Sequence, residues 1–160
     1  METYTFREQP VASDIQSIAS ILSTSGFFNA EEQKVGVSLV RERLEQGESC
    51  EYFFQFATCE SSVRGYTCFG PIPGTKSSYD LYWIAVDTTY RGQGLGTLLL
   101  TQTEQEIQKR GGTRIYIETS STDLYVPTRS FYERNGYHLE AELENYYAPN
   151  DNKLMYVKAW

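Results

Sequence analysis

The chain has 160 residues, of which 40% are hydrophobic and 22% are charged, and its formal net charge is −7 at pH 7. This length and balance fit one globular domain over residues 1–160 and exclude a disordered chain. The acidic charge argues against nucleic acid as a partner, because phosphate binding needs clustered Lys and Arg, and it favours a cationic or amine-bearing substrate.

Membrane and disulfide signals are missing from the sequence. No run approaches the roughly 20 apolar residues of a membrane span, and the first residues carry no signal-peptide pattern, so we expect no membrane partner and a cytoplasmic protein. The three cysteines are odd in number and lack C-x-x-C spacing, which indicates reduced thiols in strands.

Two amphipathic helices are predicted in the first part of the chain. Ser13 followed by Gln16 indicates a capping box ahead of an apolar stripe at helical spacing. Asn29 followed by Glu32 indicates a second capping box, and Gly47 is placed to end that helix.

From Cys50 onward the pattern changes to strands. The runs EYFFQFAT, VRGYTCFG and YDLYWIAV are rich in aromatic and β-branched residues and are separated by turn residues. They predict three sequential antiparallel strands.

Helices and strands alternate in the rest of the chain. Residues 94–110 return to a helical period that ends at Gly111 and Gly112, and the short strand RIYIET follows. Pro127 begins a further helix that ends near Gly136, and YHLEAEL and KLMYVKAW form two final strands. This order predicts one α/β fold with a mixed central sheet flanked by helices.

A glycine-rich segment lies between the strand YDLYWIAV and the following helix. It comprises Arg91, Gly92, Gln93, Gly94, Leu95, Gly96 and Thr97. Such a turn exposes backbone N–H groups at the positive end of a helix dipole, which makes an anion site with few charged side chains. A P-loop would need a Lys after its last glycine, and a dinucleotide fingerprint would need glycine where Thr97 stands. Both of these phosphate loops are excluded.

Three stretches together resemble a known family. Arg91, Gly94 and Gly96 fit the pattern Q/R-x-x-G-x-G/A, which resembles the acetyl-CoA pyrophosphate loop of the GNAT family of N-acetyltransferases. The preceding WIAVD is similar to that family's fourth strand, and SFYERNGY resembles its F-Y-E-x-x-G-[FY] signature. The resemblance implies a GNAT-like acyl-CoA N-acyltransferase fold, a sheet split near the cofactor, acetyl-CoA as co-substrate and no metal.

The resemblance also implies which residues hold the cofactor. Backbone groups of Ile84, Ala85 and Val86 are expected to pair with the pantetheine arm, and residues 91–97 to hold the pyrophosphate. Tyr125 departs from the family pattern, which often has Asn at this place, so no cofactor contact is assigned there.

Two residues are predicted to move protons. Tyr132 stands where the family keeps its general acid, and a phenol with an ordinary pKa of about 10 can donate to a departing thiolate. Glu118 is predicted to take the amine proton, directly or through water. Packing for Tyr132 and a surface carboxylate for Glu118 are the alternatives, and Asp80 and Glu51 are further candidates for the base.

Four strand tyrosines could line an acceptor pocket or simply pack. They are Tyr79, Tyr82, Tyr146 and Tyr147. His138 is the only histidine, and no G-x-S-x-G motif is present, so neither a hydrolase triad nor a catalytic metal is expected.

The sequence thus predicts an acyltransferase that moves an acetyl group from acetyl-CoA to a primary amine, by direct attack and with a small molecule as the expected acceptor. An amino acid, a polyamine, an aminated sugar or antibiotic and a protein amine all remain open. A non-catalytic acyl-CoA sensor, or an acyltransferase with another acyl chain or acceptor, are the alternatives. The apolar C-terminal strand ending in Trp160 leaves a homodimer open, through pairing with a second copy.

Overall fold

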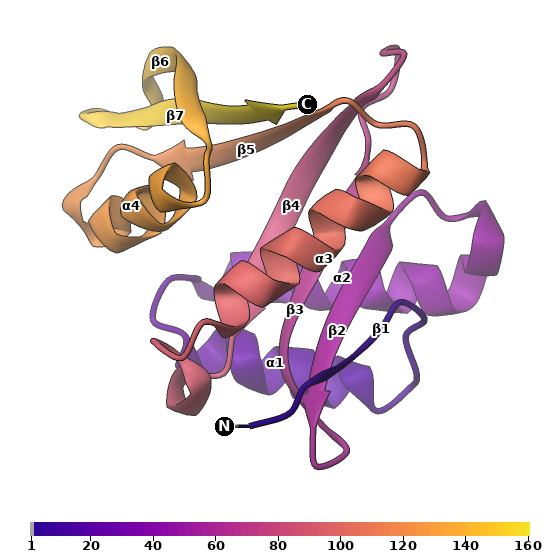
Figure 1. Ribbon diagram of the computed structural model, residues 1–160. Coiled ribbons are helices and arrows are strands. Elements are labelled where there is room, and N and C mark those ends of the chain that lie inside the picture. Colours follow the sequence, from indigo (N-terminus) through magenta and orange to yellow (C-terminus); the bar gives the residue numbers. More distant parts are fainter. Residues whose placement is uncertain (1) are drawn as a thin grey trace. The chain divides into compact units, whose positions relative to one another are not determined.

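A mixed sheet and four helices make up residues 2–160, which are the residues that the computed structural model describes (Figure 1). The sheet has seven strands in the order β1-β2-β3-β4-β5-β7-β6. The helices are α1 (Asp14–Thr24), α2 (Ala30–Gln46), α3 (Leu95–Lys109) and α4 (Val126–Arg134). The strands are β1 (Thr5–Arg7), β2 (Phe53–Cys59), β3 (Ser62–Pro71), β4 (Ser78–Val86), β5 (Arg114–Ser120), β6 (His138–Ala148) and β7 (Asp151–Ala159). The predicted α/β fold with a mixed sheet is confirmed.

The chain forms two compact units, each made of two segments. The first unit contains the chain up to Gly70 and Trp83–Glu106, and the second contains Pro71–Tyr82 and Ile107–Trp160. Strand β4 and helix α3 therefore each belong partly to one unit and partly to the other. The single-domain organisation stays a prediction.

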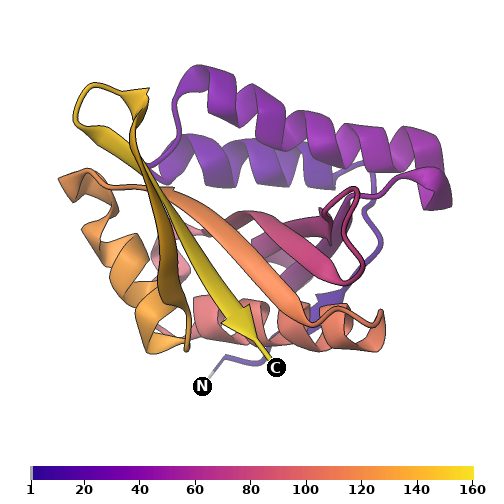
Figure 2. The same ribbon diagram turned by 90° about the horizontal axis from the view of Figure 1, so that it is seen from above.

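In the first unit, helices cover both faces of the strands. Helices α1 and α2 lie on one face and α3 lies on the other (Figure 2). Successive residues of β2 serve the two faces, because side chains alternate along a strand. Phe56 packs with Ile18 and Leu22 on the side of α1, whereas Ala57 packs with Leu99 on the side of α3. Burial on both faces explains why four successive residues of β2, from Phe54 to Ala57, are all buried.

One predicted helix cap is confirmed and the other is wrong. The backbone N–H of Glu32 donates to Asn29 Oδ1 over 2.9 Å, and the N–H of Asn29 donates to Glu32 Oε2 over 3.1 Å, as a capping box requires. Ser13 makes no side-chain cap hydrogen bond, and its backbone is helical, with φ of −66°. The Ser13–Gln16 box therefore does not form.

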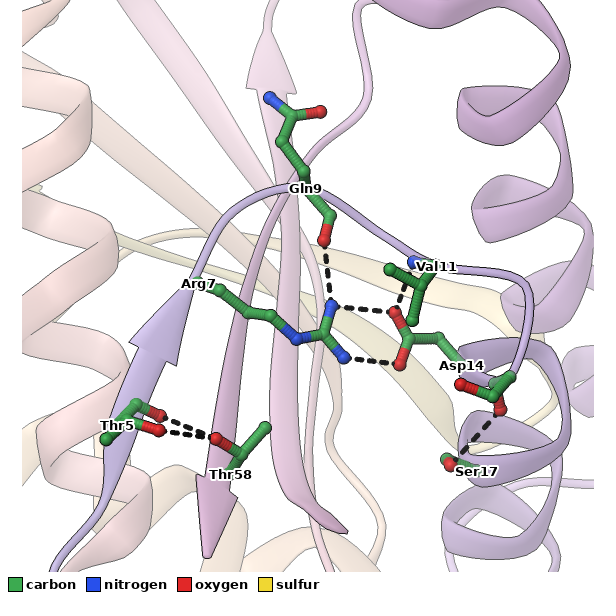
Figure 3. A network of polar contacts seen from close by, with 8 residues as sticks. Thr5, Arg7, Gln9, Val11, Asp14, Ser17 and Thr58 are labelled. Carbon is green, nitrogen blue, oxygen red and sulfur yellow. Dashed lines mark hydrogen bonds and ion pairs between the residues drawn. The ribbon is translucent and has the colours of Figure 1, made fainter. Parts of the chain in front are cut away.

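Asp14, the first residue of α1, instead makes contacts with residues before the helix that the local pattern did not reveal. Its carboxylate accepts hydrogen bonds from the backbone N–H of Val11 over 2.8 Å and from Nη1 and Nη2 of Arg7 over 2.8 and 2.5 Å (Figure 3). Arg7 belongs to β1, a three-residue strand that the sequence analysis missed. The pair fixes the start of α1 to the sheet.

In the second unit, β7 is an interior strand. It pairs antiparallel with β5 on one side and with β6 on the other. Between Lys153 and Val157, β7 is paired on both sides and offers no edge to a second copy. Strand β5 in turn pairs in parallel with β4, and this ladder joins Ser78–Asp80 to Arg114–Tyr116.

The remaining sequence expectations concern thiols and membranes. Cys50, Cys59 and Cys68 are free and buried, but Cys50 lies outside the strands. Among residues 2–160, no helix is both long enough and apolar enough to cross a membrane.

Candidate active site

The glycine-rich segment of the first unit needs glycine for its backbone. Gly92 has φ of +72° and Gly94 has φ of +84°, a region that residues with a Cβ rarely adopt. A Cβ built on either glycine would meet no atom within 4 Å. The protein itself therefore does not fill the space beside these two residues, and a ligand can approach the backbone closely.

Helix α3 begins directly after these glycines. Its first turn closes when the N–H of Leu98 donates to the carbonyl of Gly94 over 3.1 Å. The N–H groups of Leu95, Gly96 and Thr97 precede that bond and have no acceptor within the helix. The Leu95 side chain is buried and anchors the turn, while Thr97 is exposed. The segment thus presents backbone donors at a helix N-terminus, as an anion site requires.

The polar side chains of the segment hold the loop in place. Arg91 donates to the carbonyl of Ser25 over 2.9 Å, and its guanidinium lies 5.3 Å from the ring centre of Phe27. The Gln93 amide donates to the carbonyl of Thr89 over 3.1 Å. The side chains of Arg91 and Gln93, two of the residues predicted to bind the cofactor, thus already donate to carbonyl groups of the protein. The backbone N–H groups of the segment are therefore the main donors that remain for an anion.

Strand β4 carries the other predicted cofactor residues. Ile84 and Val86 pack against the cluster of Ala57, Leu95 and Leu99, whereas Ala85 is buried in the core on the other face. These side chains are all used in packing. The predicted cofactor contacts of Ile84, Ala85 and Val86 therefore concern their backbone groups, and these contacts stay a prediction.

Tyr132 lies on α4 in the second unit. Only 5% of it is exposed, and its ring centre lies 5.5 Å from Phe131, 6.0 Å from Tyr137 and 6.3 Å from Tyr156. Burial, with a smaller contribution from Tyr125, raises the pKa of the Tyr132 phenol well above its ordinary value. The phenol is therefore protonated at neutral pH and able to donate, although the same ring contacts would serve a packed tyrosine.

Glu118 lies on the exposed side of β5 and has a cationic partner. Its Oε1 is 2.7 Å from Nζ of Lys153 on β7. The same ammonium lies 4.5 Å from the ring centre of Tyr146. The sequence analysis missed Lys153, because only the register of β5 with β7 brings it beside Glu118.

The other two candidate bases, Asp80 and Glu51, lie in different units, and the candidate tyrosines differ in exposure. Asp80 interacts electrostatically with Glu118 and Lys153, whereas Glu51 is exposed in the first unit. Tyr79 is buried and packs near Gly112, which excludes it from an open pocket. The remaining three candidate tyrosines are the exposed Tyr82, Tyr146 and Tyr147. Within residues 2–160, no three His, Cys, Asp or Glu side chains are arranged to hold a metal ion.

Comparisons with known proteins agree with this description. The acetyltransferase (GNAT) family matches residues 15–137. A crystal structure of a protein from Desulfovibrio desulfuricans, described as a candidate acetyltransferase of the GNAT family, superposes with a TM-score of 0.97 at 39% identity, over 98% of this chain and 99% of that chain.

Two further proteins carry names that state a substrate. The [ribosomal protein bS18]-alanine N-acetyltransferase of Escherichia coli K12 is 33% identical over 73 residues, which are 46% of this chain and 48% of that protein. The match thus spans about half the length of this relative. An aminoglycoside 6'-N-acetyltransferase complexed with coenzyme A has a TM-score of 0.75 at 20% identity, over 98% of this chain and 96% of that chain, a likeness in fold. On the family match and the 39% identical structure, the chain belongs to the acetyltransferase (GNAT) family.

Proposed function

We propose that the protein transfers an acetyl group from acetyl-CoA to a primary amine, with a small molecule as the acceptor. The observation that carries the proposal is the start of α3, where Gly92 and Gly94 have positive φ and leave the backbone open to a ligand. The donors of residues 95–97 suit a pyrophosphate and leave the acidic chain able to bind an anionic cofactor. A related fold binds coenzyme A, which supports the same assignment.

Strand β4 supports the proposal for the pantetheine arm. The ladder of β4 with β5 contains Ser78–Asp80 and does not contain Ile84–Val86. An amide chain such as pantetheine can hydrogen-bond to strand backbone that another strand does not use. When bound, acetyl-CoA supplies the activated thioester.

Two proton transfers complete the proposed reaction. The acceptor loses a proton so that its nitrogen can attack the thioester carbonyl, and the thiolate of coenzyme A gains a proton as it leaves. We assign the second transfer to Tyr132, because its buried phenol stays protonated. Glu118 remains the residue predicted from the sequence for the first transfer.

A second acceptor class has support from the relatives. The E. coli relative acts on an alanine of a ribosomal protein, so a protein α-amine is the second candidate. The aminoglycoside enzyme and the acidic charge of the chain support the small cationic amine. A homodimer and a cytoplasmic location stay predictions of the sequence analysis.

Ligand-dependent melting tests the cofactor assignment first. Acetyl-CoA and free CoA should raise the melting temperature, since both bind only the folded protein, while NAD and ATP should not. Thiol release from acetyl-CoA is then measured with spermidine, kanamycin, single amino acids and a peptide that begins with alanine. A protein that binds acetyl-CoA but releases thiol with none of these amines would contradict the proposed transfer and favour the acyl-CoA sensor.

A further inference from the structure

Two apolar side chains of the first unit fix the ends of the glycine-rich loop. Leu95 belongs to the buried cluster with Ala57 and Leu99, and Tyr90, directly before the loop, packs against the same cluster. Residues 91–94 connect these two fixed points. The backbone donors at the start of α3 therefore keep their arrangement only while both points are held.

Arg64 of β3 holds Tyr90 in place. Its guanidinium carbon lies 4.7 Å from the centre of the Tyr90 ring, and its Nη1 lies 3.6 Å from Oδ2 of Asp87. The second distance is longer than a hydrogen bond, so charge attraction and the face of the ring hold the cation. The two side chains of the ion pair are 24% and 25% exposed, so solvent weakens their attraction only in part.

Asp87 connects Arg64 to the short turn that precedes the loop. Its second carboxylate oxygen, Oδ1, accepts the N–H and the hydroxyl of Thr89 over 3.0 and 2.8 Å. Its backbone N–H donates to the carbonyl of Arg64, and its carbonyl accepts the N–H of Tyr90, both over 2.8 Å. The carbonyl of Thr89 in turn accepts the amide of Gln93 over 3.1 Å. Contacts thus lead without a break from Arg64 to the loop.

We propose that Arg64 is a positioning residue for the cofactor, which holds the turn before the loop and so sets the backbone donors that receive the pyrophosphate. The inference rests on the proposed function. The side chains of Arg91 and Gln93 are used within the protein, so pyrophosphate binding depends on backbone geometry. Arg64 also pairs with the carboxylate of Asp87, which would otherwise place an unpaired negative charge ahead of an anion site.

Two acetyl donors separate this role from a general effect on the fold. Acetyl-CoA and S-acetylpantetheine carry the same thioester and pantetheine arm, but only acetyl-CoA contains the pyrophosphate. With the best amine of the acceptor panel, Arg64→Met should lower kcat/KM for acetyl-CoA by about tenfold, as expected when a cation–π contact and an ion pair are lost. The loss should appear in KM for acetyl-CoA, and kcat/KM for S-acetylpantetheine should not change. The ratio of the two kcat/KM values cancels any change in the fraction of folded enzyme.

Two further variants serve as controls. Arg41 is exposed on α2 of the same unit, and Arg41→Met changes the net charge by the same amount as Arg64→Met. It should use both donors as the wild type does. Arg64→Lys keeps a cation that can lie over Tyr90 and pair with Asp87, so it should recover most of the loss.

Calorimetry with CoA tests the same inference without an acceptor. The affinity for CoA should fall by about tenfold in Arg64→Met and stay at the wild-type value in Arg41→Met. An equal loss with both acetyl donors, no loss with acetyl-CoA, or an equal loss of CoA affinity in Arg41→Met would overturn this inference and leave the transferase function intact.

The proposed function fails by different results. A wild-type protein that CoA neither stabilises nor binds would overturn the proposed function, and the role of Arg64 with it. A wild-type protein that binds CoA and acetylates none of the amines would overturn the transfer alone, and the calorimetric comparison would still decide whether Arg64 positions the loop.

Discussion

The loop of residues 91–97 in the first unit and the strand side chains Asp80, Glu118 and Lys153 in the second unit present polar groups by opposite means. In the loop, donors belong to the backbone, while the side chains of Arg91 and Gln93 hold neighbouring segments. In the strands of the second unit, the backbone belongs to the sheet ladders, and the side chains of Asp80, Glu118 and Lys153 carry the charge.

This difference matches what each ligand requires. A pyrophosphate is the same in every acetyl-CoA, so a fixed set of backbone donors at a helix start suits it. An acceptor must lose a proton, and a titratable side chain can take that proton directly or through water. The two regions should therefore respond to different substitutions, in different measured quantities.

The largest effect is expected in the loop. Gly94→Val places a β-branched residue at φ of +84° and puts a side chain into the space left for the ligand. Binding of CoA, measured by isothermal titration calorimetry, should be lost. The strain alone should lower the free energy of unfolding by about 1–3 kcal/mol.

Gly74 offers a matched control for this variant. It has φ of +80° and open space beside it, but lies in the loop between β3 and β4. Gly74→Val should carry the same strain and bind CoA normally. If the two variants were equally stable and both bound CoA as the wild type does, the anion site would not be at the start of α3.

The next effect is expected at Tyr132 and should appear in turnover alone. Tyr132→Phe removes the hydroxyl but keeps the ring that packs with Phe131, Tyr137 and Tyr156. We expect kcat to fall by about 100-fold, with the affinity for acetyl-CoA nearly intact.

Tyr156→Phe is the control, since it removes a neighbouring hydroxyl that donates to Glu133 Oε1 over 3.0 Å. This variant should leave kcat close to the wild-type value. An equal loss of kcat in both variants, or an equal loss of turnover and cofactor affinity in Tyr132→Phe, would mean that Tyr132 is only a packing residue.

The same contrast explains how much the sequence could predict. The loop follows from the spacing of glycines between a strand and a helix, and the Asn29–Glu32 cap follows from residues three apart, because both are local in the chain. Lys153 lies 35 positions after Glu118, and nothing near either residue predicts their pairing. Only the register of β5 with β7 brings them together, and register depends on the whole sheet.

Long-range pairing also explains why the Ser13 cap failed. Ser13 and Gln16 have the right spacing, but Arg7 on β1 binds the carboxylate of Asp14, and that carboxylate also accepts the N–H of Val11. The short β1 was itself missed because three residues give too little alternation to identify a strand.

The Arg7–Asp14 pair is a third case, in which a charged pair stabilises the fold and has no part in the proposed reaction. The Asp14 side chain is 1% exposed and the Arg7 side chain is 32% exposed. Removing Arg7 leaves a buried carboxylate without its ion-pair partner, so it should destabilise the protein more than removing the charge of Asp14. We expect Arg7→Met to lower the free energy of unfolding by about 3–5 kcal/mol, as the loss of one partner of a buried pair does. Asp14→Asn leaves the charge of Arg7, which is better solvated, and should lower the free energy of unfolding by less.

Urea unfolding of both variants and of the double variant measures these differences. Arg7→Met with Asp14→Asn should be more stable than Arg7→Met alone, because no buried charge is left unpaired. At a temperature where each variant is folded, kcat and the affinity for CoA should match the wild type. If Asp14→Asn were the more destabilising of the two, the hydrogen bond from the N–H of Val11 would matter more than the ion pair with Arg7.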